Sequence, residues 1–459
     1  MNLSEIARAL VTGSESAGAT QAEAYAVLAK TSSIYIDDNI PKIADVKEEV
    51  GVGLKFITGK RIGFTSSTLL SESIEDVIER ARSMAKVSAE DEKFVSLPDP
   101  KRPSGSANQF YDRPTGEADS DVLLERTMTL VSSAARDSVS VPNGVLRTSS
   151  TDFRITNSLG ADAESKSTMV FGYFTAKAEE SGSVGEGVQR CWSRSLDDVD
   201  FAQIGAKLQH QALDVIQAKG FKENWKDAVA VLTPSEGGEM LGSMIGYAVS
   251  AENVNNRSSP WTDKMGESVA HESMTIADNG LSEKGLLSAV VDDEGTPMQT
   301  TSIIEKGVLK SYLYDSYNAA QVDLKSTGNG IRRDPRDAQG SFSSPVRCGS
   351  TTLEVLSGIK SVEDIISEVK RGVYIEHFAW PQVDSLAGTF SNEIRNAQLI
   401  ENGELTAKIK YALLVGNLFE SFSQEVVFGS DLEVHGVFGN PCCCVLPTMA
   451  ITGTEIVGQ

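Results

Sequence analysis

The chain has 459 residues, of which 40% are hydrophobic and 23% are charged. These proportions are typical of a folded globular protein and exclude a disordered or fibrous one, and the length favours two domains. The formal net charge of -22 disfavours direct binding to nucleic acid, because such binding normally needs clustered Lys and Arg against the phosphates.

No stretch reaches the roughly 18 consecutive apolar residues of a membrane-spanning helix, so no membrane association is expected. The first residues, MNLSEIARALVTGSESAGATQ, are polar where a signal peptide has an apolar block. The five cysteines, Cys191, Cys348 and the run Cys442–Cys444, are an odd number and do not have the spacing of a disulfide framework. We therefore expect a cytoplasmic protein with reduced thiols.

The first half of the chain alternates between helical and strand patterns. Apolar residues spaced at three and four predict helices over 2–18, 71–87, 120–137 and 200–218. Alternating apolar and polar residues predict antiparallel strands of a curved sheet over 21–67 and 144–191. Prolines and polar residues predict a long exposed connection over 88–120. These elements describe an N-terminal α/β domain, residues 1–220.

The second half is richer in strands. DAVAVLT predicts a strand, and SEGGEMLGSMIGYAVSAE predicts a helix over 236–250 whose glycines indicate close packing. From about residue 268 onward the chain reads as short β segments, LLSAVVDDEGT among them, and only 362–372 clearly predicts another helix. The expected fold class is α+β, with a C-terminal barrel or sandwich and a few helices over 221–459.

The histidines lack the spacing of a catalytic metal site. They are His210, His271, His377 and His435, and none lies within five residues of another. A catalytic zinc site commonly uses two histidines one helical turn apart, with a nearby Glu as base. His271 and Glu272 begin such a motif, but the residues after them continue as a predicted strand, so this match is interpreted as incidental.

Two further clusters leave a metal role open. Cys442 and Cys444 lie on the same side of a predicted strand, although small buried residues are the favoured interpretation. Asp292, Asp293 and Glu294 precede a glycine and have the oxygens to hold a cation, although a solvated turn is favoured there.

The segment DDEGTPMQTTSIIEKGVLKSYLYDSYNA, residues 292–319, resembles the TldD/PmbA (TldE) peptidase family. The resemblance extends to GFTSSTLLSESIEDVIERARSMAKVSAEDEKFVSLPDP in the first half and to LIENGEL, LLVGNLFESF and PTMAITG near the end, so it covers almost the whole chain. It implies an α/β region and a β-rich region, paired in a TldD/TldE dimer that encloses a chamber.

In TldD-type members of the family a helix carries HExxxH, and a later cysteine completes a zinc site. The corresponding helix here, 236–250, contains no histidine, and Met240 and Ile245 occupy roughly the positions that the histidines would use. The resemblance therefore implies the TldE/PmbA branch, with no catalytic or metal-binding residue in this chain and zinc only in a TldD-type partner.

Three segments are expected to line the peptide chamber. They are 236–250, 292–301 and 376–390, with the candidate residues Glu236, Glu239, Met240, Ile245, Asp292, Asp293, Glu294, His377 and Trp380. The favoured hypothesis is a noncatalytic subunit of a metalloprotease that processes unfolded peptides, in a heterodimer or a homodimer. The alternatives are a self-associating peptide-binding or scaffold protein, and a metal enzyme that uses Cys442, Cys444 and a distant His.

Overall fold

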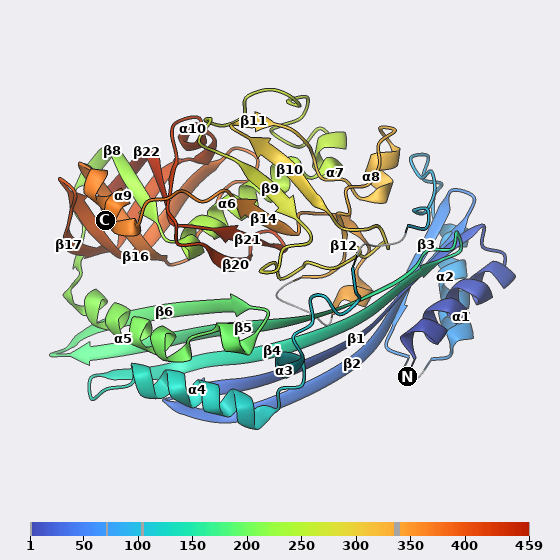
Figure 1. Cartoon of the computed structure of the whole chain (residues 1–459), viewed down its shortest axis with the longest axis horizontal. Helices are drawn as coiled ribbons and strands as arrows, with labels where there is room; N and C mark the ends of the chain where they lie inside the picture. Colours follow the sequence, from blue (N-terminus) through green and yellow to red (C-terminus); the bar gives the residue numbers. More distant parts are fainter. Residues whose placement is uncertain (1, 70–71, 102–104, 335–339, 459) are drawn as a thin grey trace.

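A computed structural model describes residues 2–69, 72–101, 105–334 and 340–458. The first half forms one six-stranded antiparallel sheet that curves beneath the rest of the molecule (Figure 1). Its strands, in sheet order, are β3 (Arg61–Ser67), β2 (Ile40–Thr58), β1 (Gln21–Asp37), β4 (Val139–Asn157), β5 (Asp162–Glu180) and β6 (Ser183–Ser193). The curved sheet predicted from alternation is confirmed.

Helices cover the convex face of this sheet. They are α1 (Leu3–Ser16), α2 (Ile74–Val87), α4 (Ser120–Ala134) and α5 (Phe201–Gln217), and a short α3 (Arg113–Gly116) lies in the long connection. Along β1, Ala22 packs in the cluster with α1 and α2, and Ile34 packs in the cluster with α4 and α5. Tyr25 points the other way, into a cluster shared with the C-terminal half. Because side chains alternate between the two faces of a strand, one face of β1 packs against the helices and the other packs against the C-terminal half.

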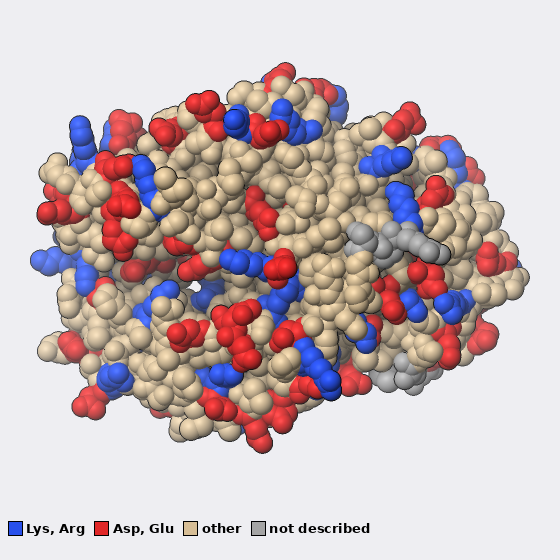
Figure 2. Space-filling view, in the orientation of Figure 1, with Lys and Arg blue, Asp and Glu red and all other residues tan. Residues whose placement is uncertain are grey.

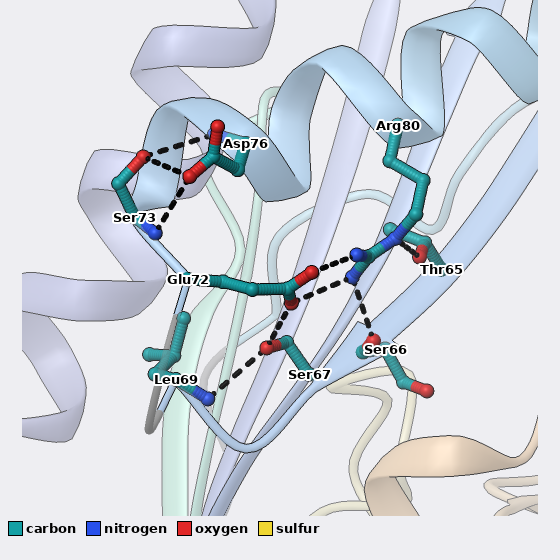
Figure 3. Close-up of polar contacts among 8 residues, drawn as sticks. All are labelled: Thr65, Ser66, Ser67, Leu69, Glu72, Ser73, Asp76 and Arg80. Atoms are coloured by element: carbon teal, nitrogen blue, oxygen red, sulfur yellow. Dashed lines mark hydrogen bonds and ion pairs between the residues drawn. The ribbon is translucent and has the colours of Figure 1, made fainter.

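A polar network holds the start of α2 against β3 (Figure 3). Ser73 and Asp76 form a reciprocal capping box, which satisfies amides that the helix cannot pair internally. Arg80 binds Glu72 and also donates from Nε to the Thr65 hydroxyl at 2.6 Å. The expected start of this helix at Ser71 lies outside the described residues, as does Pro103 of the connection.

The C-terminal half contains a second six-stranded sheet and a closed barrel. The sheet consists, in order, of β11 (Val308–Leu309), β10 (Thr300–Glu305), β9 (Ile276–Asn279), β14 (Thr352–Val355), β21 (Cys442–Leu446) and β20 (Glu433–Val437). The barrel consists of β15 (Arg371–Phe378), β8 (Asn224–Leu232), β22 (Met449–Gly458), β18 (Ala412–Asn417) and β16 (Thr389–Glu401), and it closes because β15 also pairs with β16.

Smaller elements complete this half. They are the strands β7 (Lys219–Gly220), β12 (Gly330–Ile331), β13 (Arg347–Cys348), β17 (Glu404–Lys410) and β19 (Val427–Phe428), and the helices α7 (Ala251–Asn255), α8 (Ser316–Ala320), α9 (Val362–Glu368) and α10 (Leu418–Phe422). The predicted α+β fold class is confirmed, whereas the domain boundary at Gly220 stays a prediction. None of the helices in the described part of the chain is long and apolar enough to cross a membrane.

The helix α6 (Pro234–Val249) lies in the core of the C-terminal half, beside β20 and β21. A Cβ on its Gly242 would lie 2.5 Å from Val437 Cγ2, so the close packing expected from its glycines is confirmed. The strand predicted at LLSAVVDDEGT is wrong: Leu286–Thr296 is irregular apart from a single bridge at Val291. Its backbone is instead satisfied by side chains and by neighbouring loops.

Candidate functional site

A cavity of about 270 Å³ lies between the two halves of the molecule, at the N-terminal end of α6. We call it the α6 cavity. Figure 2 shows the surface hollowed between the two halves, with charged side chains around the opening. The α6 cavity is lined by Val188–Arg190 of β6, Lys207, His210 and Gln211 of α5, Thr233–Glu236, Tyr374, Glu376, His377, Asp431, Glu433, His435 and Thr448.

The start of α6 opens into this cavity without a side-chain cap. Thr233 occupies the N-cap position, but its side chain makes no capping bond to the helix. Gly237 N donates to the Thr233 carbonyl as the first turn closes, whereas the amides of Ser235 and Glu236 belong to the set that a helix leaves unpaired. Partial positive charge therefore accumulates at this end of the cavity.

Glu236 and His377, both predicted to line the chamber, lie together in the α6 cavity. Glu236 Oε2 accepts a hydrogen bond of 3.1 Å from the Phe378 amide, and Glu236 Oε1 lies 3.5 Å from His377 Nδ1. The Glu236 side chain is buried at 2% exposure, and the His377 side chain is half-buried at 15%. The pair joins α6 to β15, so it positions the first turn of the helix against the barrel.

The sequence pattern did not reveal that three of the four histidines meet at this cavity. His435 Nε2 lies 3.2 Å from Glu433 Oε2, and His210 Nδ1 lies 3.2 Å from Asp214 Oδ2. Burial raises the pKa of Glu376, whose carboxylate accepts from Asn396 at 2.6 Å. The local signal was the spacing of two between Glu433 and His435, which places both on one side of a strand.

A second cavity of about 640 Å³, the Trp380 cavity, lies along the middle of α6. Glu239 and Ser243 of α6 line it, together with Phe438, Gly439 and residues of the segments 380–385 and 389–392. The exposed Trp380 ring lies 6.1 Å from the Phe438 ring, which lies 6.2 Å from Trp192 of β6. An apolar wall therefore stands opposite polar groups, an arrangement suited to a flexible organic ligand.

Glu239 positions part of the backbone that lines the Trp380 cavity. Its carboxylate accepts from the amides of Phe438, at 2.8 Å, and Gly439, at 2.7 Å. Burial raises the pKa of Glu239, and these two amides oppose that rise because they stabilise the charged form. Glu239 thus holds the turn between β20 and β21 that carries Phe438.

Met240 and Ile245 line neither the α6 cavity nor the Trp380 cavity. Both side chains are 0% exposed and pack in the C-terminal core. The face of α6 that carries them packs in the core of the C-terminal half, and the expectation that they line the peptide chamber stays a prediction. The Met240 sulfur accepts a hydrogen bond from Asn392, a residue that lines the Trp380 cavity.

Asp292, Asp293 and Glu294 form a buried network away from both cavities. Asp292 accepts from the amides of Glu294, Thr296 and Gly330, and Asp293 binds the backbone and side chain of Arg333. The three acids are 0%, 0% and 2% exposed, so the solvated turn favoured from sequence is wrong. Burial, followed by the charge of Asp315, raises the pKa of Glu294 to about 7.

The residues beside α6 do not fit a catalytic zinc ion. Among the residues that the structure describes, no group of three or more His, Cys, Asp or Glu is arranged to hold a metal. Both carboxylates on the cavity side of α6 are already held by backbone amides. Cys442 and Cys444 are buried in the core, and the hydrogen bond with Cys442, followed by burial, raises the pKa of Cys444 well above that of a free thiol.

The fold and cavities define an α+β protein in which a curved sheet and a closed barrel flank polar cavities along one buried helix. Sequence profiles of the PmbA/TldA metallopeptidase match the chain throughout: domain 1 at residues 22–85, the central domain at 113–215 and the C-terminal domain at 226–458. The chain belongs to the PmbA/TldA metallopeptidase family, as its sequence resemblance predicts.

Individual relatives agree with this family. A metalloprotease of Methanocaldococcus jannaschii is 28% identical over 396 residues, which cover 84% of each chain. A TldD homolog of Buchnera aphidicola, also a metalloprotease, is 31% identical over 260 residues, or 56% of this chain and 52% of that protein. TldE from Thermococcus kodakarensis has the same fold, with a TM-score of 0.89 at 23% identity over 99% of this chain and 100% of that one.

Proposed function

We propose that this chain is a noncatalytic, TldE/PmbA-like subunit of a TldD/TldE-type metalloprotease assembly. It contributes cavity walls that hold an unfolded peptide, and it leaves the zinc ion and the activated water to a TldD-type partner. The family membership and the TldE-like fold support this role. Five free, buried cysteines support a reducing, cytoplasmic location.

The observation that carries the proposal is the set of side chains on α6. Its sequence, PSEGGEMLGSMIGYAV, offers no imidazole, and its two carboxylates are engaged by the amides of Phe378, Phe438 and Gly439. These bonds hold both carboxylates in place, and without an imidazole the helix lacks the ligand pair that a catalytic zinc site commonly uses. The cavities beside α6 are therefore suited to binding rather than to hydrolysis.

The test is co-expression with a TldD-type chain that carries HExxxH, followed by sizing, metal analysis and cleavage of an unfolded peptide. We expect a stable complex, stoichiometric zinc that disappears when the partner's HExxxH histidines are changed to Ala, and no cleavage by this chain alone. Chelator-sensitive cleavage by the purified chain alone would contradict the proposal. A homodimer that ignores the TldD-type chain would support the alternative, a self-associating peptide-binding or scaffold protein.

A further inference from the structure

The acidic side chains of the α6 cavity have direct partners, whereas two of its basic side chains do not. Its carboxylates each have a partner: Glu236 binds the Phe378 amide, Glu376 binds Asn396, Asp431 accepts from Thr448 at 2.7 Å, and Glu433 faces His435. The cations lack direct partners. Within the described residues, the side chains of Arg190 and Lys207 form no hydrogen bond and no ion pair, although Arg190 interacts electrostatically with Glu239 and Lys207 with Glu433 at longer range.

Arg190 is held in place by an aromatic ring rather than by an acid. Its guanidinium lies over the Phe438 ring, with Cζ 5.4 Å from the ring centre. Stacking of this kind orients the planar group and leaves its five N–H donors available, because the ring engages only its face. Arg190 lies between the two cavities, since it lines the α6 cavity while Phe438 lines the Trp380 cavity.

Two residues that line this cavity carry buried polar atoms without partners. The Thr233 hydroxyl and His435 Nδ1 have no hydrogen-bond partner among the described residues, and His435 is only 7% exposed. Glu433 engages His435 Nε2, so Nδ1 is the ring nitrogen that remains without a partner. An unpaired buried polar atom is unfavourable, so a small shift that brings a ligand group to it is favoured.

The uncapped start of α6 adds to these donors. The amides of the first turn and the helix dipole favour a negative group at this end, and Arg190 and Lys207, whose side chains have no direct ion pair, favour the same charge. A planar anion with two acceptor oxygens matches the two-pronged donor geometry of a guanidinium. Carboxylate is the anion of this shape that every peptide carries.

We propose that the α6 cavity binds a carboxylate of the peptide, through Arg190, Lys207 and the N-terminal turn of α6. The adjoining Trp380 cavity then receives a neighbouring side chain of the same peptide against Trp380 and Phe438. This inference rests on the proposed function, because it assumes that the bound molecule is an unfolded peptide. It assigns to this subunit the recognition of peptide charge, a step that needs no metal.

The test uses the full chain and a fluorescein-labelled ten-residue peptide of Gly, Ser, Ala and Leu. Fluorescence anisotropy compares the peptide with a free C-terminal carboxylate, the same peptide with a C-terminal amide, and an amidated peptide with one internal Glu. We expect the free acid to bind about 10-fold more tightly than the amide, as for a charge-assisted bidentate contact. Equal binding of free acid and amide would overturn the inference.

Two variants test whether the preference for the free acid arises in the α6 cavity. Arg190→Gln removes the guanidinium, and Lys207→Gln removes an exposed charge on α5 that forms no direct ion pair. Both should reduce the preference for the free acid, whereas Arg82→Gln, on the distant α2, should leave it unchanged. If neither cavity variant changes the preference, the carboxylate binds elsewhere and the inference fails.

The remaining comparisons distinguish which group supplies the anion that binds in the α6 cavity. Tight binding of the internal Glu peptide would assign the site to acidic side chains, whereas weak binding would assign it to the chain terminus. Displacement of the free-acid peptide by an equimolar amount of inorganic phosphate would contradict a peptide site. A carboxylate preference in a chain that ignores its TldD-type partner would leave this inference standing and overturn the proposed function. A complex with the TldD-type chain but no carboxylate preference would leave the proposed function standing and overturn this inference.

Discussion

Glu23 of β1 and Arg332 form a buried ion pair that joins the N-terminal sheet to the C-terminal half across 309 residues of sequence. The distance from Arg332 Nη2 to Glu23 Oε1 is 2.7 Å, and the two side chains are 1% and 0% exposed. Arg332 also lies over the rings of Tyr25 and Phe64, at 5.3 and 5.5 Å. The pair therefore helps to fix how the two halves pack, and hence the shape of the cavity between them.

Removal of Glu23 should destabilise the protein strongly. Glu23→Ala leaves the buried Arg332 charge with no carboxylate partner and also removes the partner of Lys55, 3.3 Å away, so we expect a loss of about 3–5 kcal/mol in the free energy of unfolding. Arg8→Ala, which breaks the exposed pair with Asp162, should cost only about 0–1 kcal/mol. Urea unfolding followed by circular dichroism measures both. Similar small losses in the two variants would contradict a structural role for the buried pair.

The Glu72–Arg80 contact should make stability depend on acidic pH (Figure 3). Hydrogen bonds from Arg80 and Ser67 lower the pKa of Glu72 from 4.5 to about 2. Because the folded pKa is depressed, the contribution is fully present above pH 4.5 and is lost as pH falls towards 2.

The variant Glu72→Gln checks this dependence. It should be less stable than the parent chain at pH 6, and the difference should shrink as pH falls below 4.5, when urea midpoints are compared across pH. Glu75→Gln, on an exposed position of the same helix, serves as the matched control and should show no such trend. A Glu72→Gln deficit that stayed constant down to pH 2 would show that the charge is not responsible.

Glu294 should have the opposite pH dependence. Its folded pKa of about 7 lies above the ordinary 4.5, so the folded state binds more protons and stability falls as pH rises through this window. Glu294→Gln removes that decline while keeping groups that can bond Ser316, and it should be the more stable chain at pH 8.

Asp292, two residues earlier, should respond differently when its carboxylate is replaced by an amide. Asp292→Asn should be destabilised by about 1–3 kcal/mol, because the new amide group meets a backbone N–H that needs an acceptor. Thermal unfolding at pH 5 and pH 8 distinguishes the two variants. A Glu294→Gln chain that was less stable than the parent chain at pH 8 would argue against burial as the cause of the raised pKa.

Trp380 should matter for peptide binding and little for folding. The side chain is 58% exposed, so Trp380→Ala should change the free energy of unfolding by no more than about 0.5 kcal/mol. The same change removes the aromatic wall of the Trp380 cavity and should weaken binding of the labelled peptide about 5- to 10-fold. Trp261→Ala, at a 5% exposed position, should instead cost about 3–5 kcal/mol of stability. Unchanged peptide binding in Trp380→Ala would remove this cavity from the binding surface.

The sequence by itself determined the elements and their order. Periods of two and of 3.6 residues are local properties, so they predicted the curved sheet, its helices and the glycine-packed helix α6. They failed at Leu286–Thr296, where an apolar run satisfies its backbone through long-range bonds instead of a strand ladder. The absence of histidine from α6 was also readable from the sequence alone.

Only the tertiary structure decided which side chains meet. Glu236 and His377 were predicted for the chamber and do lie together, but Met240 and Ile245 of the same helix are in the core. Arg190, Lys207 and three histidines come from β6, α5, β15 and β20, and no local pattern connects them. Their meeting depends on the curvature of the sheet and on how the barrel packs against it, and these follow from contacts between residues hundreds of positions apart.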